Sequence, residues 1–343
     1  MPLLPTLAEH TTIHVGGVPD AWVTAHTEAE LITAVTECDR RGTPVLLLGG
    51  GSNTLVADEG FRGTVVAIRS RGLEVTPAGA DVIVRAAAGE PWDTLVDRCV
   101  RERWAGVEAL SGIPGLVGAT PIQNVGAYGQ DVSQTITSVR ALDRRTGEVS
   151  VMSREDCGFG YRSSAFKADL DRWVVLEVEF RLATTGVGDV RYTELARALQ
   201  VDVGGSSDVD RIRSTVLGLR RAKGMVLDAN DPDTRSVGSF FVNPIVTDDV
   251  SATIPDECPR YPSMEGVKLS AAWLIENSGI ARGFRVSPDA AAAVSTKHSL
   301  ALTNQSDAAA SDVIVLARAI RDRVRGTFGV TLQPEARLVN CAL

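Results

Sequence analysis

The sequence has few of the residues that build metal sites or disulfide frameworks. It contains four histidines, without metal-site spacing, and five cysteines, which form no CxxC pair. An odd number of scattered cysteines is typical of reduced thiols in a cytosol. No run approaches the roughly 18 apolar residues of a transmembrane helix, and the opening "MPLLPTLAEHTT" lacks the basic region and apolar core of a signal peptide. We therefore expect a cytoplasmic protein without a metal site.

Excess positive charge is also absent. The net charge is −8, with 44% hydrophobic and 23% charged residues. Surfaces for nucleic acids or anionic membranes need clustered Lys and Arg, so neither partner is expected. The composition is that of an ordinary globular protein, and 343 residues exceed the usual size of a single hydrophobic core. Two or more domains are therefore expected.

Several familiar catalytic and nucleotide-binding motifs are missing. The chain has no GK[ST] Walker loop and no GxGxxG dinucleotide fingerprint. It also has no GxSxG elbow and no Cys/His arrangement that would argue for a hydrolase. If the protein binds a dinucleotide, the site is not of the Rossmann type.

The hydrophobic pattern predicts two strand-rich α+β units rather than a regular βαβ series. The segment "QVDVGGSSD", residues 200–208, is polar and predicts a loop and a domain boundary. The tail at 330–339 predicts a strand that returns to the first domain. Helices are expected at 31–42, 91–100, 209–219, 269–279 and around 313–324, and strands at 44–48, 63–68, 81–88, 176–182 and 238–241, with a hairpin at 139–152 that turns at Thr146-Gly147.

Two glycine-rich stretches are candidates for ligand binding. "GGGSN", Gly49 to Asn53, follows a buried strand, and its amides suit a diphosphate; a tight turn is an equally good interpretation. The second stretch, "SGIPGLVGATPIQNVGAYG" from Ser111 to Gly129, cannot form a regular helix or a central strand. Because it is uncharged, it favours backbone wrapped around a flat ligand, and a long surface loop is the alternative.

Two groups of charged residues have both functional and structural interpretations. Arg162 in "CGFGYRSSAF" has mostly apolar neighbours in the sequence, so its charge needs a bound anion or an acidic side chain. For a lone arginine, a structural salt bridge is the commoner explanation. Arg220 and Lys223 in "LRRAKG" share one face of a helix end. Taken alone, that pair is most often a solvated last turn.

Ser239 and Glu335 are polar residues in apolar surroundings. Ser239 lies in "RSVGSFFVNP", between a glycine and two phenylalanines, where a small apolar residue would pack as well. A buried hydroxyl without a partner costs roughly 1–3 kcal/mol. Either this hydroxyl is hydrogen-bonded or the protein needs a proton there. Glu335 follows a proline inside the apolar strand expected from "LQPEARL", which alone is a weak signal.

Together these stretches resemble the UDP-N-acetylenolpyruvoylglucosamine reductase (MurB) family, flavoenzymes of bacterial peptidoglycan precursor synthesis. The motifs "GGGSN", "IPGLVGATPIQNVGAYG", "GYRSSAFK", "GSFFVNP", "KLSAAWLIENSG" and "PEARL" occur in the family's order. The chain is most similar to type I members, because "VRYTELARAL" resembles their tyrosine-bearing insertion. The segment "DANDPDTR" is several residues longer than usual in the family.

The resemblance implies an α+β fold. It comprises a two-part, non-Rossmann FAD-binding domain of the PCMH, or vanillyl-alcohol-oxidase-like, type and a smaller α+β substrate-binding domain. The expected domains are 1–70 and 71–208 for the two FAD-binding parts, 209–328 for substrate binding, and 329–343 for a C-terminal strand that contributes to the active site. A monomer is expected.

The resemblance also implies the site residues. FAD is expected to bind non-covalently, because "LLLGGGSN" has no histidine for a covalent linkage. The implied FAD ligands are Gly49, Gly50, Gly51, Ser52, Asn53, Ile113, Gly115, Gly118, Ala119, Thr120, Asn124, Gly126 and Tyr128. The implied substrate ligands are Tyr161, Tyr192, Arg220, Lys223 and Asn243, and the implied catalytic residues are Arg162, Ser239 and Glu335.

The family's reaction gives the three catalytic residues their roles. NADPH, the transient reductant, reduces FAD; UDP-N-acetylglucosamine enolpyruvate then enters the same cleft and receives a hydride at C3. Arg162 would hold the carboxylate, Glu335 would stabilise the enol, and Ser239 would protonate C2. Binding both substrates in one cleft needs no Rossmann domain and predicts ping-pong kinetics. An FAD-linked oxidase and an inactive binding module are the alternatives.

Overall fold

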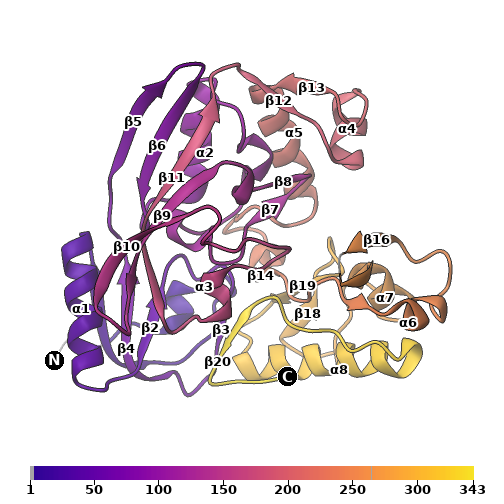
Figure 1. Ribbon diagram of the computed structural model, residues 1–343. Helices are drawn as coiled ribbons and strands as arrows, with labels where there is room; N and C mark the ends of the chain where they lie inside the picture. The colour runs from indigo at the N-terminus through magenta and orange to yellow at the C-terminus, as the bar shows by residue number, and fades with distance from the viewer. Residues whose placement is uncertain (1–3, 264) are drawn as a thin grey trace. The chain divides into compact units, whose positions relative to one another are not determined.

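The computed structural model describes residues 4–263 and 265–343 (Figure 1). The chain forms two compact units. The central unit contains Asp20–Gly50 and Arg62–Arg221. The terminal unit contains the residues up to Pro19, Gly51–Phe61 and Ala222–Leu343. These bounds group the residues differently from the four ranges expected from the sequence.

The central unit is built around a five-stranded antiparallel sheet, in which the long strand β11 lies between β9 and β6 (Figure 1). A three-stranded sheet has the order β1-β4-β2, and two small hairpins, β7-β8 and β12-β13, complete the pairing. The strands are β1 Pro19–Ala25, β2 Val45–Leu48, β4 Phe61–Ile68, β5 Leu73–Ala78, β6 Asp81–Ala87, β7 Gly126–Ala127, β8 Gln130–Asp131, β9 Ile136–Asp143, β10 Glu148–Ser153, β11 Trp173–Ala183, β12 Val187–Asp189 and β13 Ser206–Asp208. The helices are α1 Glu28–Arg40, α2 Trp92–Arg101, α3 Ala165–Ala168, α4 Thr193–Leu199 and α5 Val209–Ala222, with 3₁₀ turns η2 Glu108–Leu110, η3 Val117–Ala119 and η4 Val132–Gln134.

The terminal unit combines three small sheets with the long helix α8. Strand β14 pairs with β19, β17 lies between β15 and β16, and β20 runs parallel to β3. One large hydrophobic core contains Phe240, Phe241 and the inner face of α8. The strands are β3 Thr54–Val56, β14 Ser236–Ser239, β15 Ile245–Val246, β16 Arg260–Ser263, β17 Gly266–Leu269, β18 Ala292–Val294, β19 Ala301–Asn304 and β20 Arg337–Val339. The helices are α6 Asp248–Ala252, α7 Ala271–Asn277 and α8 Ala310–Phe328, with η1 Leu7–His10 and η5 Pro232–Thr234.

Strong periodicity predicted the elements correctly. The hairpin is confirmed, since β9 and β10 pair antiparallel and turn through residues 144–147. The apolar residues of α2 lie on one face and are buried; they are Trp92, Leu95, Val96, Cys99 and Val100. The alternating residues Leu176, Val178, Phe180 and Leu182 of β11 are buried as well. Both patterns work because one face of each element packs on a core.

Three sequence-based expectations were wrong in detail. The first helix begins at Glu28, because the Thr27 side chain accepts a hydrogen bond from the Glu30 amide and caps it. The loop expected at 200–208 ends in strand β13, which pairs with β12. The tail does return to the segment 54–56, but Glu335 lies in the bend before β20 rather than inside a strand.

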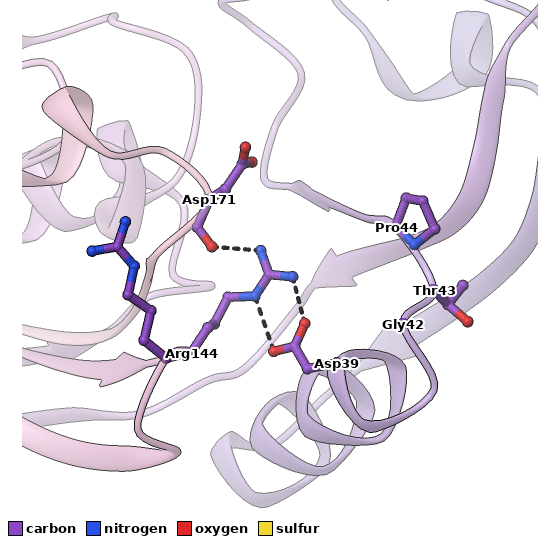
Figure 2. A pocket seen from close by; sticks show the side chains of 7 residues that line it. Asp39, Gly42, Thr43, Pro44, Arg144 and Asp171 are labelled. Carbon is purple, nitrogen blue, oxygen red and sulfur yellow. Dashed lines mark hydrogen bonds and ion pairs between the residues drawn. The ribbon is translucent and has the colours of Figure 1, made fainter.

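A shallow hollow in the central unit, about 340 Å³, lies between the end of α1 and the β9–β10 turn (Figure 2). Arg144 donates to both oxygens of Asp39 and to the Asp171 carbonyl, so each of its three guanidinium nitrogens has an acceptor within the protein. None of the hollow's lining residues is a predicted site residue. We interpret it as a charge-paired surface feature that ties α1 to the sheet.

Candidate active site

Close backbone contacts within the protein explain two of the three glycines in the first glycine-rich loop. A Cβ on Gly50 would lie 2.8 Å from the Gly115 Cα, so the two glycine-rich stretches touch backbone to backbone. Gly51 has φ +62°, and a Cβ there would lie 2.1 Å from the His10 carbonyl oxygen. A Cβ on Gly49 would meet only an ordinary contact with Leu116 at 3.6 Å. The tight-turn interpretation therefore accounts for Gly50 and Gly51 without a ligand.

The same loop also has features that fit a diphosphate. Within the residues that the structure describes, the amides of Gly50 and Gly51 donate to no backbone or side-chain acceptor. Consecutive amides of this kind form anion-binding nests. Ser52 and Asn53 follow directly, and the Asn53 amide donates to the Glu335 carbonyl oxygen over 3.4 Å. The loop is therefore compatible both with binding the phosphates of FAD and with the tight-turn interpretation.

The second glycine-rich stretch is an ordered loop held close to the sheet of the central unit. Its backbone is bound at several points, including the amide of Gly118 to the Ala88 carbonyl. A Cβ on Gly118 would lie 2.5 Å from the Ala88 Cβ, so glycine is required there. Ile113 packs against the main core, Thr120 is buried and bonded to the Val117 carbonyl, and Ala119 is exposed. The surface-loop alternative is wrong for most of this stretch.

Asn124 is fixed by the protein itself. The Asn124 side chain donates to the Gly160 carbonyl over 3.0 Å and accepts from the Ser133 amide over 3.1 Å. It thereby ties the glycine-rich loop to the loop that carries Tyr161 and Arg162. Its side chain has a structural task whether or not its backbone faces FAD.

Arg162 belongs to the central unit and has φ 51°. Its Nη2 donates to the Gly126 carbonyl oxygen over 2.9 Å, and Lys167 Nζ donates to the Arg162 carbonyl over 2.8 Å. The Nε atom is buried and has no hydrogen-bond acceptor in the described chain, although the residue has other contacts. The guanidinium is therefore oriented along Gly126.

Tyr128, Tyr192 and Arg220 form a second group in the central unit. The rings of Tyr128 and Tyr192 meet edge to face with centroids 5.6 Å apart. Burial raises the pKa of Tyr128 to about 12, although the positive charge of Arg220 acts to lower this pKa. Arg220 is half-buried with its Nε in the interior, and burial lowers its pKa, so a fully solvated turn does not describe this residue. Tyr161 and Tyr192 each expose nearly half of their surface.

The sequence reasoning missed an ion pair that anchors this group. Arg213 of α5 donates to both oxygens of Asp93 in α2, over 2.7 and 3.0 Å. Asp93 also accepts from the Gly112 amide at the start of the glycine-rich loop, over 2.6 Å. The pair joins α5 to that loop. A spacing argument could not find it, because its members lie on separate helices.

In the terminal unit, backbone pairing brings Ser239 and Glu335 together. The Glu335 amide donates to the Phe240 carbonyl over 2.7 Å, and Phe241 pairs with Pro334. A β-bulge between Ser236 and Ser239, with Gly238 at φ 75°, turns the chain just before Ser239. Bulges commonly re-aim a side chain next to an active site.

Ser239 is half-buried, and its hydroxyl makes no hydrogen bond within the described chain. Of the two sequence-based explanations, internal hydrogen bonding therefore finds no support. The penalty argued for a buried hydroxyl is also too large, because water can reach a half-buried one. Phe240 and Phe241 are fully buried in the core and hold the strand rather than cover the serine.

Asn243 and Lys223 complete the predicted residues of the terminal unit. The Asn243 side-chain oxygen accepts from the Ala271 amide over 2.9 Å at the start of α7, so only its NH₂ group is left to donate elsewhere. Lys223 follows the end of α5 and is half-buried. The next residue, Gly224, packs on Asp233, since a Cβ there would lie 3.2 Å from the Asp233 Cβ.

Asp233 anchors the long "DANDPDTR" segment beside Lys223. It is buried and accepts from the Thr296 amide and hydroxyl and from Gln305 Nε2. Burial alone would raise the pKa of Asp233, but the hydrogen bonds from Thr296 and Ser295 and the charge of Lys297 hold it below its usual value. Asp231, in the same segment, forms an ion pair with Lys297.

We expect Asp233→Asn to lower the free energy of unfolding by about 1–3 kcal/mol at neutral pH, because a charged acceptor of buried hydrogen bonds is lost. A carboxyl with a depressed pKa stabilises the fold above its unfolded pKa of about 3.9, and this contribution disappears as the pH falls through the folded pKa. Urea unfolding from neutral pH downward should therefore show the difference from wild type shrinking in acid. Asp289→Asn, on an exposed loop, is the matched control. A difference that stays constant with pH would contradict the prediction.

In the described chain, no group of three or more His, Cys, Asp and Glu side chains could hold a metal ion. The residues that the structure describes also include no helix both long and apolar enough to cross a bilayer.

Comparisons with known proteins identify the family. Residues 19–153 match the "FAD binding domain" family, and residues 231–339 match the "UDP-N-acetylenolpyruvoylglucosamine reductase, C-terminal domain" family. The UDP-N-acetylenolpyruvoylglucosamine reductase of Salinispora arenicola is 52% identical to this chain, and the alignment spans 98% of this chain and 95% of that protein. The protein of the same name from Cutibacterium acnes is 50% identical, over 98% of this chain and 90% of its own.

A solved structure agrees with these relatives. The MurB crystal structure from Thermus caldophilus superposes with a TM-score of 0.67 at 25% identity and covers 98% of this chain and 97% of its own. The matched domains and the mixed helix and strand content confirm the expected α+β fold with a non-Rossmann FAD-binding domain. This chain belongs to the UDP-N-acetylenolpyruvoylglucosamine reductase family of FAD-dependent oxidoreductases.

Proposed function

We propose that this protein reduces UDP-N-acetylglucosamine enolpyruvate to UDP-N-acetylmuramate with NADPH, and so supplies a precursor of bacterial peptidoglycan. FAD, held by Gly49 to Asn53 and by the loop from Ile113 to Tyr128, would supply the hydride-transfer chemistry between NADPH and C3 of the enolpyruvyl group. Addition of one proton at C2 completes the reduction, and NADP⁺ is released. Beyond family membership, the observation that carries the proposal is the pairing of residues 240–242 with 333–335, which joins Ser239 to Glu335 in one unit.

Three residues of the chain would perform the chemistry on the substrate. Arg162 binds the substrate carboxylate and stabilises the negative charge that grows on it after hydride addition. Glu335, in its protonated form, stabilises the enol. Ser239 donates the proton to C2. Its hydroxyl is suited to this because it makes no hydrogen bond to another group of the described chain.

Other residues would bind and orient the ligands. Tyr161, Tyr192, Arg220, Lys223 and Asn243 bind the UDP-sugar, with Asn243 donating from its side-chain NH₂ group. The FAD diphosphate is held by Gly49 to Asn53 and the isoalloxazine by the loop from Ile113 to Tyr128. The ranges 1–70 and 71–208 form the FAD-binding part, 209–328 the substrate-binding part, and 329–343 the closing strand.

Anaerobic stopped-flow absorbance of the flavin tests the proposed function. We expect NADPH alone to bleach the yellow protein and UDP-N-acetylglucosamine enolpyruvate, added second, to restore the colour rapidly. Steady-state rates should follow ping-pong kinetics, since each half-reaction ends before the next begins. The control is UDP-N-acetylglucosamine, which lacks the enolpyruvyl group and should leave the flavin reduced.

An FAD-linked oxidase that acts on an alcohol or lactone is the alternative function. It would show a flavin that ignores the enolpyruvyl substrate and is reoxidised quickly once oxygen is admitted. Nothing in an oxidase mechanism requires Ser239 and Glu335 together, which favours the reductase. We further propose that the protein works in the cytoplasm as a monomer, and light scattering would test the monomer.

A further inference from the structure

Glu108 is a fully buried acid that the proposed mechanism does not use. It lies in the 3₁₀ turn η2, just before the glycine-rich loop, and 0% of its surface is exposed. Oε2 accepts from the Gly106 amide over 2.6 Å, and Oε1 accepts from Gln130 Nε2 over 2.7 Å. A carboxylate with no solvent contact is costly unless its oxygens are bonded in this way. Its retention in the core suggests a specific task.

The partner side chain, Gln130, has only one orientation that satisfies its contacts. Its Oε1 accepts from the Ala109 amide over 2.8 Å, so its NH₂ group must face Glu108. Both oxygens of Glu108 therefore act as acceptors, which a carboxylate can do and a glutamine cannot. The Glu108 carboxylate and the Gln130 amide thus form one hydrogen-bonded network between the amides of Gly106 and Ala109.

The network leads directly to Arg162. Gln130 begins strand β8, whose partner strand β7 contains Gly126. The Gly126 carbonyl oxygen accepts from Arg162 Nη2 over 2.9 Å, and a Cβ on Gly126 would lie 3.5 Å from Nη1. The position of the β7–β8 hairpin therefore sets the position of the guanidinium.

The surroundings keep the carboxylate dry and in place. A Cβ on Gly188 of β12 would lie 1.9 Å from Glu108 Oε1, so the β12–β13 hairpin packs directly over the acid. The Glu108 carbonyl also accepts from the hydroxyl of buried Ser111 over 2.6 Å, at the start of the glycine-rich loop. Glu108 is thus packed between the hairpin and the loop, with little room to move.

We propose that Glu108 is a positioning residue, which acts through Gln130 and the β7–β8 hairpin to orient Arg162 toward the carboxylate of the enolpyruvyl substrate. The inference rests on the proposed function, because Arg162 has this task only in that reaction. It predicts that loss of the Glu108 charge affects the substrate half-reaction far more than the reduction of FAD.

The test compares Glu108→Gln with wild type in the two half-reactions. The glutamine must turn its NH₂ group toward either the Gly106 amide or Gln130, so one contact becomes repulsive and the hairpin shifts. We expect reoxidation by the enolpyruvyl substrate to slow roughly 10- to 100-fold, since misplacement by about 1 Å can cost this much. Bleaching by NADPH should stay within about twofold of wild type on the same reasoning. The affinity for UDP-N-acetylmuramate, measured by calorimetry, should fall with reoxidation because Arg162 also binds its carboxylate.

Controls keep the outcomes distinct. Glu102→Gln makes the same charge change at the exposed end of α2 and should match wild type. If Glu108→Gln does not retain FAD, Gln130→Asn breaks the network from its other end without a change of charge, and the same split is expected. Equal slowing of both half-reactions, or of neither, would overturn the inference. Wild type that is not reoxidised by the enolpyruvyl substrate would overturn the proposed function instead.

Discussion

Replacing Ser239 by alanine is expected to slow reoxidation of the reduced flavin by UDP-N-acetylglucosamine enolpyruvate by roughly 10²–10⁴-fold, the usual contribution of a positioned general acid. The reason is local. The hydroxyl has no acceptor within the described chain. The irregular pairing between Ser236 and Ser239 ends at Ser239, which pairs with Ala301 and is followed by the Phe240 carbonyl that binds the Glu335 amide. Alanine removes the proton and leaves the backbone pairing intact, so NADPH should still bleach the flavin at nearly the wild-type rate. Single-turnover stopped-flow absorbance measures both rates.

Two comparisons make this experiment decisive. Ser287→Ala removes a hydroxyl from an exposed loop of the same unit and should change neither rate. Ser239→Cys restores a dissociable proton and should recover part of the lost rate. If Ser239→Ala is reoxidised as fast as wild type, the serine only packs and the proton comes from another group.

Trp92→Ala should have the largest effect on stability, with a loss of about 3–5 kcal/mol in the free energy of unfolding, as is typical when a buried aromatic side chain is removed. Trp92 is 1% exposed and its ring lies 5.9 Å from that of Phe180 across the main core of the central unit. Its Nε1 also donates to the Leu110 carbonyl over 3.1 Å, at the entrance to the glycine-rich loop. The variant should therefore retain less FAD as well. Urea unfolding followed by circular dichroism, and the ratio of flavin to protein absorbance, check the two effects.

A conservative variant separates packing from hydrogen bonding. Trp92→Phe keeps most of the ring and loses the N–H group, which should cost about 1–2 kcal/mol, mainly for the Leu110 carbonyl left without its donor. Trp22→Phe, on strand β1 at the surface of the unit, should stay within about 0.5 kcal/mol of wild type. A loss of under about 1 kcal/mol for Trp92→Ala would contradict the assignment of this residue to the core.

Much of the local structure could be predicted from the sequence. The buried face of α2 and the alternation of β11 follow from periodicity, which depends only on residues a few positions apart. The cap at Thr27 was missed, although the chain carries its signal, a threonine three residues before Glu30. The start of the first helix was placed three residues late for this reason.

The candidate residues could be named from motifs, but their surroundings could not. The burial of the Arg220 Nε atom and the two hydrogen bonds of Asn124 depend on segments that are distant in the chain. Glu108 gave no signal at all, because a lone acid in an apolar stretch is not distinguishable from an exposed one without its partner Gln130. The role of Gly50 was only partly predicted from the sequence. A Cβ there would clash with the Gly115 backbone, so packing requires a glycine at this position whether or not a ligand binds.

By itself, the sequence determined the helices and strands with strong periodicity, the family, and the residues that can carry the chemistry. The tertiary structure alone decided that Glu335 pairs with Phe240 beside Ser239, and that Glu108 connects through Gln130 to Arg162. The physical reason is the range of the interactions. Helix and strand propensities are set by neighbours along the chain, whereas backbone pairing and the burial of a charge are set by whichever distant segment folds against them.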